Sequence, residues 1–91
     1  MSNNMVYIAL QNNEDARPII EAIEQDNPEA TVNHFPAMVK IDAAGRLTVK
    51  RETVEELIGR SWDPQEMHLH LVSISGNVDE DDDFFAVERR N

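Results

Sequence analysis

Short runs of apolar and alternating residues predict several strands along the chain. The apolar run Met5–Leu10 is followed by polar residues and is typical of a buried strand. Thr31–Phe35 predicts a second strand, which Pro36 interrupts because proline cannot donate a ladder hydrogen bond. Alternation through Met67–Ile74 predicts a long strand, and Phe84–Val87 predicts a last one.

A hairpin is predicted in the middle of the chain. Apolar and polar residues alternate through Val39–Asp42 and again through Arg46–Lys50. Between these two segments lies Gly45, a residue that readily adopts the positive φ of a short hairpin loop. We therefore expect the two segments to pair with each other across a tight turn at Gly45.

Two segments have the spacing of amphipathic helices. Apolar residues recur at helical intervals through Ala16–Ile23, and Asn13 or Asp15 can cap the start of this helix. Thr53–Glu56 has the spacing of a capping box, and Gly59 is placed to end a second, shorter helix.

The order of these elements predicts an α+β fold with a mainly antiparallel sheet and two or three helices packed on it. With 91 residues, the chain is expected to form a single compact domain spanning 1–91. We expect the helices to cover one face of the sheet. The other face, or a sheet edge, would then remain open to a partner.

Charge and composition narrow the classes of function. Eighteen acidic and eight basic residues give a formal net charge of −10, which repels phosphate backbones and anionic lipids. The absence of cysteine excludes disulfides, thiolate nucleophiles and sulfur-ligated metal centres. The segment Met1–Asn4 has no basic and apolar export signal, and no apolar run approaches a membrane span. We therefore expect a cytoplasmic protein that contacts neither nucleic acid nor membrane.

Candidate catalytic and ligand-binding chemistry is sparse. His68 and His70 would share one strand face, a spacing that some metal sites use, but a third ligand is not evident and we predict no metal. The acidic run Asp79–Asp83 lacks the later residues of a calcium loop and is interpreted as a solvated loop after a turn at Gly76 and Asn77. Neither a glycine-rich phosphate loop nor a nucleophile elbow is present.

The aromatic residues are expected mainly in the core. Trp62 and the phenylalanines are large enough to dominate a small core, although aromatic side chains also anchor interfaces. Phe84 and Phe85 are adjacent and must point to opposite sides of a strand. One of these two side chains is therefore a candidate exposed anchor for a partner.

A resemblance to a known family extends over most of the chain. It is carried by Gln11–Glu24, Pro36–Ile41, Gly45–Thr48 and Ser73–Asp83. These segments resemble the effector, or coupling, proteins of bacterial diiron monooxygenases, and most closely the small regulatory component of phenol hydroxylases. The resemblance implies a non-catalytic protein without cofactor, which docks on a separate diiron hydroxylase. There it would couple oxygen activation, substrate access and electron delivery to aromatic hydroxylation.

Contact residues and alternatives remain predictions at this point. We expect hydroxylase contacts from polar or aromatic residues near strand ends and bends, namely Asn33, His34, Phe35, Ser73, Ser75 and Asn77. The main alternative is a stand-alone α+β domain that binds a small ligand or uses a metal. A second alternative is an acidic mimic that blocks a basic surface, whose binding would weaken strongly with salt.

Overall fold

The computed structural model describes residues 4–89 of the chain. Strands dominate, and two α-helices and one 3₁₀ helix complete the fold. The elements in chain order are β1 (Met5–Gln11), α1 (Arg17–Asp26), β2 (Thr31–His34), β3 (Met38–Ala44), β4 (Arg46–Lys50), α2 (Arg51–Ile58), the 3₁₀ helix η1 (Pro64–Leu69), β5 (Leu71–Ser75), β6 (Asn77–Glu80) and β7 (Phe84–Glu88).

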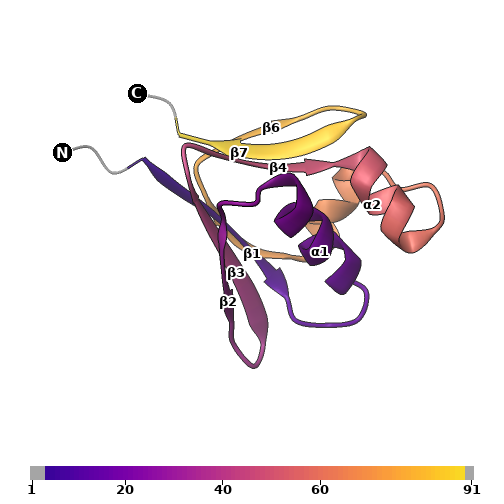
Figure 1. Cartoon of the computed structure of the whole chain (residues 1–91), viewed down its shortest axis with the longest axis horizontal. Coiled ribbons are helices and arrows are strands. Elements are labelled where there is room, and N and C mark those ends of the chain that lie inside the picture. The colour runs from indigo at the N-terminus through magenta and orange to yellow at the C-terminus, as the bar shows by residue number, and fades with distance from the viewer. Residues whose placement is uncertain (1–3, 90–91) are drawn as a thin grey trace.

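The strands form two sheets instead of the single sheet expected from the sequence. The larger sheet has the order β2-β3-β1-β5 and the smaller sheet the order β4-β7-β6. All neighbouring strands are antiparallel, so the predicted α+β class with antiparallel pairing is confirmed. The sheets converge at one corner and diverge from it, and α1 lies between them (Figure 1). Each sheet therefore turns one face toward the helices.

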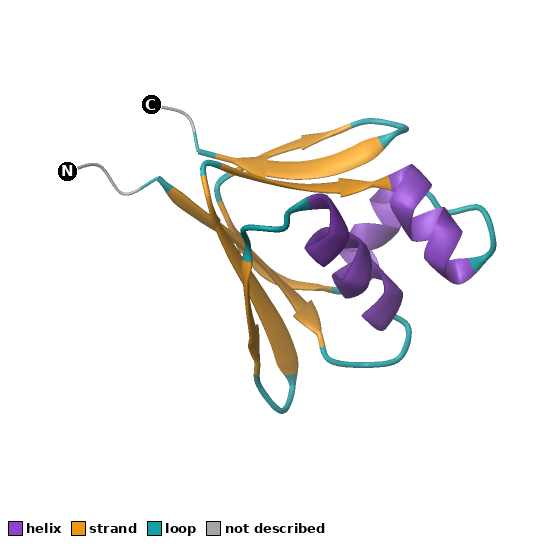
Figure 2. Ribbon diagram, in the orientation of Figure 1, coloured by secondary structure: helices purple, strands orange, loops and turns teal. Residues whose placement is uncertain are grey.

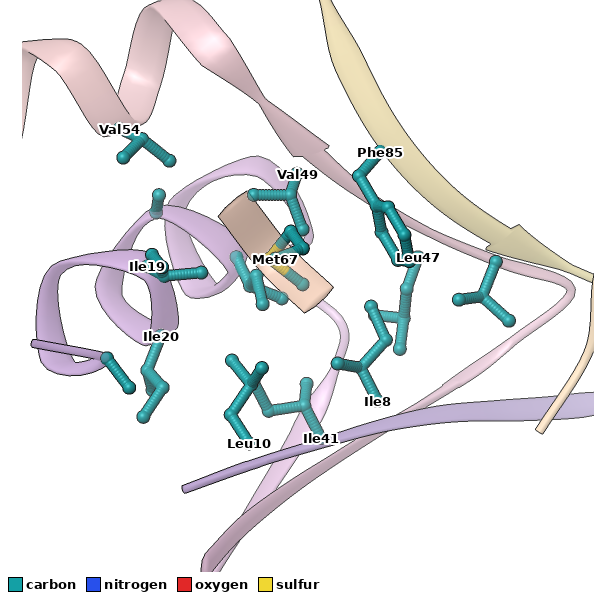
Figure 3. Close-up of a cluster of buried hydrophobic side chains, with 14 of the residues drawn as sticks. Ile8, Leu10, Ile19, Ile20, Ile41, Leu47, Val49, Val54, Met67 and Phe85 are labelled. Atoms are coloured by element: carbon teal, nitrogen blue, oxygen red, sulfur yellow. The ribbon is translucent and has the colours of Figure 1, made fainter. Parts of the chain in front are cut away.

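The core fills the space between the sheets and the helices. Alternate residues of β1 and β3 are buried on the inner face of the larger sheet, namely Val6, Ile8, Leu10, Val39 and Ile41. Leu47 and Phe85 contribute from the smaller sheet, and their side chains lie near Ile8 in Figure 3. Complete burial of such side chains contributes about 1.5–3 kcal/mol each. This period-two burial sets which residues face outward.

The predicted hairpin at Gly45 is wrong in its pairing, although the conformation of the glycine is as expected. Gly45 has a φ of 82°. Both edges of β3 are occupied, one by β1 and the other by β2, so β4 cannot pair with it. Instead β4 pairs with β7. Gly45 is thus the point where the chain leaves the larger sheet and enters the smaller one.

The predicted strand Met67–Ile74 is wrong in its first half, where η1 forms. Pro64 occupies the first turn of η1, and Asp63 and Glu66 form a capping box. The Asp63 carboxylate accepts from the Gln65 N–H at 2.9 Å, and the Asp63 N–H donates to Glu66 at 3.0 Å. This local cap outweighs the weak alternation of apolar residues. The strand β5 begins only at Leu71.

Smaller corrections concern the helix starts and the acidic run. Asn13 caps the turn before α1 by accepting from the Ala16 N–H at 2.9 Å, and Asp15 takes no part. The predicted capping box at Thr53 is absent because α2 begins at Arg51, directly after β4, while Gly59 ends α2 as predicted. The acidic run is only partly a loop, since β6 extends to Glu80.

The C-terminal end of α1 closes the free edge of β4. The side-chain amide of Asn27 donates to the Thr48 carbonyl at 2.7 Å and accepts from the Thr48 N–H at 3.1 Å, as a neighbouring strand would. The Asp26 carboxylate accepts from the Lys50 N–H at 3.3 Å and from the Thr53 hydroxyl at 2.9 Å. These contacts satisfy backbone groups that an edge strand otherwise leaves to solvent or to another chain.

Candidate functional site

The outer face of the larger sheet is not covered by any helix or strand of residues 4–89, and both α-helices lie on its inner side (Figure 2). The strand register places two rows of four side chains on this face, beside the pairs Met5-Ala44 and Gln11-Met38, because directly opposed residues of antiparallel strands share a side. We call this surface the open face. Its rows are Thr31-Asp42-Tyr7-Ser75 and Asn33-Lys40-Ala9-Ser73.

Side-chain contacts connect the open face from one edge strand to the other. On β2, the Asn33 amide donates to the Asp42 carboxylate at 2.9 Å. Asp42 lies 3.6 Å from the Lys40 ammonium group, which is 4.5 Å from the ring centroid of Tyr7. The Ser73 hydroxyl on β5 donates to the Tyr7 hydroxyl at 3.3 Å. The network holds these polar groups in fixed positions before any partner arrives.

Charge is balanced on the open face although the chain is strongly acidic. Lys40 and Asp42 are the charged residues of its two rows and form an ion pair, while the Arg89 guanidinium lies against Ser75 at one edge. The remaining side chains of the two rows are neutral. Because the centres of protein interfaces are depleted in charged residues, a balanced and mostly neutral surface suits docking better than the acidic remainder.

Three of the predicted contact residues lie on the open face, but on opposite edges of it. Asn33 is on β2, whereas Ser73 and Ser75 are on β5, with β3 and β1 in between. Ser75 accepts a hydrogen bond from the Arg89 guanidinium at 2.7 Å. The structure therefore brings these residues onto one surface without direct contact between the two groups.

The other three predicted residues lie apart from the open face. His34 has the inward parity of β2, opposite Val39, and is exposed at the sheet edge. Phe35 follows in the β2–β3 turn and keeps 45% of its surface exposed. Asn77 belongs to the smaller sheet, where it is paired with Glu88. Of the six, only Asn77 thus lies outside the larger sheet and its turns.

Exposed apolar side chains gather where β1 ends. The Asn12 side chain donates to the Phe35 carbonyl at 3.1 Å, and the Gln11 N–H donates to the His70 carbonyl at 2.9 Å. These bonds bring the β2–β3 turn and the η1–β5 junction to the same end of the larger sheet. We call this surface the apolar end. Its large apolar side chains are Phe35, Leu69 and Val72, which are 45%, 71% and 51% exposed.

Sequence reasoning missed several residues of this surface. Tyr7, Lys40 and Asp42 link the two edges, and their position could have been inferred because each alternates with a buried residue such as Ile8 or Ile41. Leu69 was assigned to the apolar side of a strand. It is exposed because η1 replaces that strand, and only the Asp-Pro-x-x capping pattern could have indicated this.

The aromatic side chains divide between core and surface. Trp62 and Phe85 are buried, which agrees with the expected core role. Phe84 is half-buried on the outer side of β7, where the Arg46 guanidinium lies 5.7 Å from its ring centroid. Phe35 is the exposed aromatic residue, so the more exposed anchor candidate lies in the β2–β3 turn and not in β7.

His68 and His70, which were considered as a metal pair although no metal was predicted, are not on a common strand face. His68 lies in η1 and His70 follows it as the C-cap. His68 Nε2 is 3.0 Å from the Glu80 carboxylate, and its ring packs edge-on against Phe85. Within residues 4–89, no group of three or more histidine, aspartate or glutamate side chains is arranged to hold a metal ion.

A hollow beside β4 and α2 does not have the character of an anion site. It has a volume of about 710 Å³ and lies between β4, α2 and Phe84. Arg46 in its wall is paired with Glu88 at 2.6 Å. Arg51 is 3.4 Å from Asp83. These guanidinium groups are neutralised within the chain, so the hollow offers no concentrated positive charge.

No helix in the described residues is long and apolar enough to cross a bilayer. The fold and the two surfaces define a small α+β binding domain with a pre-ordered, mostly neutral sheet face and an apolar rim. The chain belongs to the MmoB/DmpM family, whose model matches residues 4–88. The family resemblance inferred from the sequence is confirmed.

Comparison with individual proteins agrees with this family. Over 89 residues the chain is 56% identical to the phenol 2-monooxygenase stimulatory component DmpM of Pseudomonas sp. (strain CF600), and the match covers 98% of this chain and 99% of the relative. Two chains from structures of a phenol hydroxylase–regulatory protein complex match with TM-scores of 0.90 and 0.86. The first is 51% identical and the match covers 94% of this chain and 99% of that one. The second is 50% identical, with coverage of 92% and 98%.

A more distant structure shares the fold. The regulatory protein B of soluble methane monooxygenase matches with a TM-score of 0.75 at 21% identity. The match covers 99% of this chain and 67% of that protein. The arrangement of two sheets around the helices is therefore maintained despite extensive sequence change.

Proposed function

We propose that this chain is the regulatory component of a bacterial multicomponent phenol hydroxylase and that it binds the diiron hydroxylase component. The names of its relatives support the assignment, since one is a stimulatory component and two come from complexes of a phenol hydroxylase with its regulatory protein. The observation that carries the proposal is the open face, an uncovered sheet surface whose polar groups are already fixed by mutual contacts.

Regulation by such a protein works through differential binding. A chain without catalytic groups changes the activity of a larger enzyme only if it binds one conformational state more tightly than another. Coupling free energies of this kind are typically about 1–3 kcal/mol. We propose that the favoured hydroxylase state is the one in which oxygen activation, substrate access and electron delivery are coupled to hydroxylation. The chain acts in the cytoplasm as a non-catalytic accessory subunit with no cofactor or substrate of its own.

The docking surface in this proposal combines the open face with the apolar end. Asn33, Ser73 and Ser75 supply polar contacts, and Phe35 supplies an apolar anchor. Fixed side chains lose less conformational entropy on binding than free ones, so the hydrogen-bonded network lowers the cost of association. We assign His34 and Asn77 to the rim of the same surface, where contacts contribute less to affinity.

Reconstitution tests the function. Purified hydroxylase and reductase are mixed with increasing amounts of this chain, and phenol hydroxylation and NADH oxidation are measured together. We expect both the hydroxylation rate and the product formed per NADH to rise to saturation. Heat-denatured chain serves as the control. Unchanged rate and coupling at saturating concentration would reject the assignment.

The site variants test the docking surface separately. Ser73→Ala and Phe35→Ala are expected to raise the effector concentration needed for half-maximal stimulation, while far-UV circular dichroism stays unchanged because both side chains are exposed. Glu29→Ala replaces an exposed residue of the α1–β2 loop and is the control. If all three variants and the wild type needed the same concentration for half-maximal stimulation, Ser73 and Phe35 would not be part of the docking surface.

The alternative of a stand-alone ligand-binding or metal-dependent domain has less support. Both arginines that line the hollow beside β4 and α2 are already ion-paired, and the histidine pair does not share a face. The acidic-mimic alternative predicts a steep loss of affinity with salt. Docking through the nearly neutral open face predicts a shallower salt dependence, which titration of the hydroxylase at several ionic strengths measures directly.

A further inference from the structure

A groove lined by both polar and apolar side chains lies beside Leu69, between the apolar end and the helices. It has a volume of about 410 Å³ and lies between the start of α1, the end of α2 and η1. Ile19, Val54 and Trp62 are its buried residues, while Ile58 and Leu69 form its walls. Figure 3 shows Ile19 and Val54 on facing helices at one end of the core. The groove therefore opens directly onto the core of the protein.

Leu69 connects the groove to the docking surface proposed above. This side chain is 71% exposed, the highest value among the large apolar residues in the described part of the chain. It belongs to the apolar end and also lines the groove. Isolated exposed leucines are common on protein surfaces, but a leucine that lines a groove beside a docking surface can contact the same partner as that surface.

The rim of the groove is acidic. Glu14, Asp15 and Glu66 lie on it, against the basic residues Arg60 and His70. Arg60 is 3.8 Å from Glu66, so this pair is neutralised locally. Glu14 and Asp15 have no cationic partner within residues 4–89. An occupant that carries positive charge beside its apolar group would complement this rim.

We propose that the groove receives an aliphatic or aromatic side chain from a segment of the hydroxylase that carries lysine or arginine next to that side chain. The proposal rests on the function proposed above and specifies a second contact of the same complex. Leu69 and Ile58 give such an anchor exposed apolar surface above the buried Trp62, and interface energy concentrates where anchors fill pockets. A volume near 410 Å³ lies within the range of about 300–1,000 Å³ typical of ligand pockets.

The first test fills the groove without changing the docking surface. Ile58→Phe enlarges a half-buried wall residue, whereas Leu57→Phe makes a similar enlargement at the next position of α2, outside the groove. Affinity for the purified hydroxylase is measured by calorimetry. We expect Ile58→Phe to raise Kd about tenfold or more and Leu57→Phe to change it by less than about twofold. Equal Kd values for the two variants would overturn the proposal.

The second test addresses the rim. The double variant Glu14→Lys with Asp15→Lys is compared with Glu21→Lys with Glu24→Lys, which exchanges two exposed α1 carboxylates outside the groove. Both variants change the net charge equally, so long-range attraction is matched. We expect the rim variant to bind the hydroxylase at least about fivefold more weakly than its control. Indistinguishable affinities would overturn the charge assignment.

The third test observes the groove itself. Trp62 is the single tryptophan of the chain, so 5-fluorotryptophan labelling gives one ¹⁹F resonance from the groove floor. We expect unlabelled hydroxylase to shift this resonance in the wild type and not in Ile58→Phe. A shift caused by phenol alone, or by concentrating the chain alone, would assign the groove to a small aromatic ligand or to a second copy and overturn the proposal.

These outcomes separate the groove from the function. If the wild type does not bind or stimulate the hydroxylase, the proposed function fails. If it does so while the groove variants match their controls, the function stands and the groove contact is rejected. If Ile58→Phe and the rim variant both weaken binding, with circular dichroism unchanged, the groove contact is supported.

Discussion

Asn27 offers a sharp test of how α1 is held against the smaller sheet. Its side chain makes three hydrogen bonds: the amide donates to the Ile23 carbonyl at 2.8 Å and to the Thr48 carbonyl at 2.7 Å, and its oxygen accepts from the Thr48 N–H at 3.1 Å. Asn27→Ala removes all three. The substitution also leaves the N–H and C=O of Thr48 without their partner at a half-buried edge of β4.

The expected loss in free energy of unfolding follows from these contacts. A net hydrogen bond contributes about 0.5–1.5 kcal/mol, and a buried polar group left unpaired costs about 1–3 kcal/mol. Because water can reach part of this edge, we expect a loss of about 2–4 kcal/mol. Small domains have a total stability of about 5–15 kcal/mol, so this is a large share. The Tm should fall by about 10 °C or more, since about 4–8 °C corresponds to each kcal/mol in a domain of this size.

Urea unfolding followed by Trp62 fluorescence and by far-UV circular dichroism measures the effect, because Trp62 is buried at 4% exposure. Asn77→Ala is the matched control, since that exposed asparagine carries no side-chain bond of this kind, and it should change stability by less than about 0.5 kcal/mol. Asn27→Asp should be at least as destabilising as alanine, because a carboxylate faces two carbonyl oxygens. A loss below about 1 kcal/mol for Asn27→Ala would refute the reasoning.

Other substitutions test the 3₁₀ helix, the open face, and Gly45 and Gly76, where the chain passes from the larger sheet to the smaller one. A Cβ at Gly76 would lie 2.5 Å from Val87 Cγ1 at a φ of 129°, so Gly76→Ala should destabilise by about 3 kcal/mol in chemical denaturation. A Cβ at Gly45 would meet nothing within 4 Å at a φ of 82°, so Gly45→Ala should destabilise by only about 1–2 kcal/mol. If Gly45→Ala and Gly76→Ala destabilised the protein equally, the steric argument would be contradicted. Asp63→Ala removes the cap of η1 and should lower the free energy of unfolding by about 1 kcal/mol. An unchanged free energy of unfolding would refute the role of the cap. Asp42→Ala frees Asn33 on the open face and should weaken hydroxylase binding in calorimetry while changing stability by less than about 1 kcal/mol; wild-type affinity would argue against a pre-ordered face.

Local patterns predicted which residues are buried but not which strands are neighbours. The alternation around Ile41 and Val49 correctly indicated buried side chains, and the positive φ of Gly45 was correctly anticipated. Their assignment to one hairpin failed because both sheets contribute to the same core, so inward-facing residues look alike whichever sheet holds them. Pairing partners distant in sequence, such as β4 and β7, leave no trace in local alternation.

The candidate site was also only partly predictable, because local patterns do not show which strands are neighbours. Asn33 and Ser73 were selected as polar residues near bends, and the structure places both on one surface. Their connection through Tyr7 depends on the order of strands in the larger sheet, which no spacing along the chain reveals. Leu69 was missed because the Asp63 cap and the following proline form η1 where alternation indicated a strand.

Both ends of the described chain meet at Gly45. Its N–H donates to the Asn4 carbonyl at 2.8 Å, and its carbonyl accepts from the Arg89 N–H at 2.9 Å. The apolar end lies at the far end of β1, whose 7 residues span about 23 Å at the usual rise of about 3.3 Å per residue. A fluorophore, affinity tag or surface tether attached ahead of Asn4 would therefore leave the apolar end accessible, which allows immobilised or single-molecule measurements of assembly, whereas Arg89 contacts Ser75 of the docking surface. Joining the termini and opening the chain at Asp81–Asp83 would give a circular permutant with the same strand neighbours.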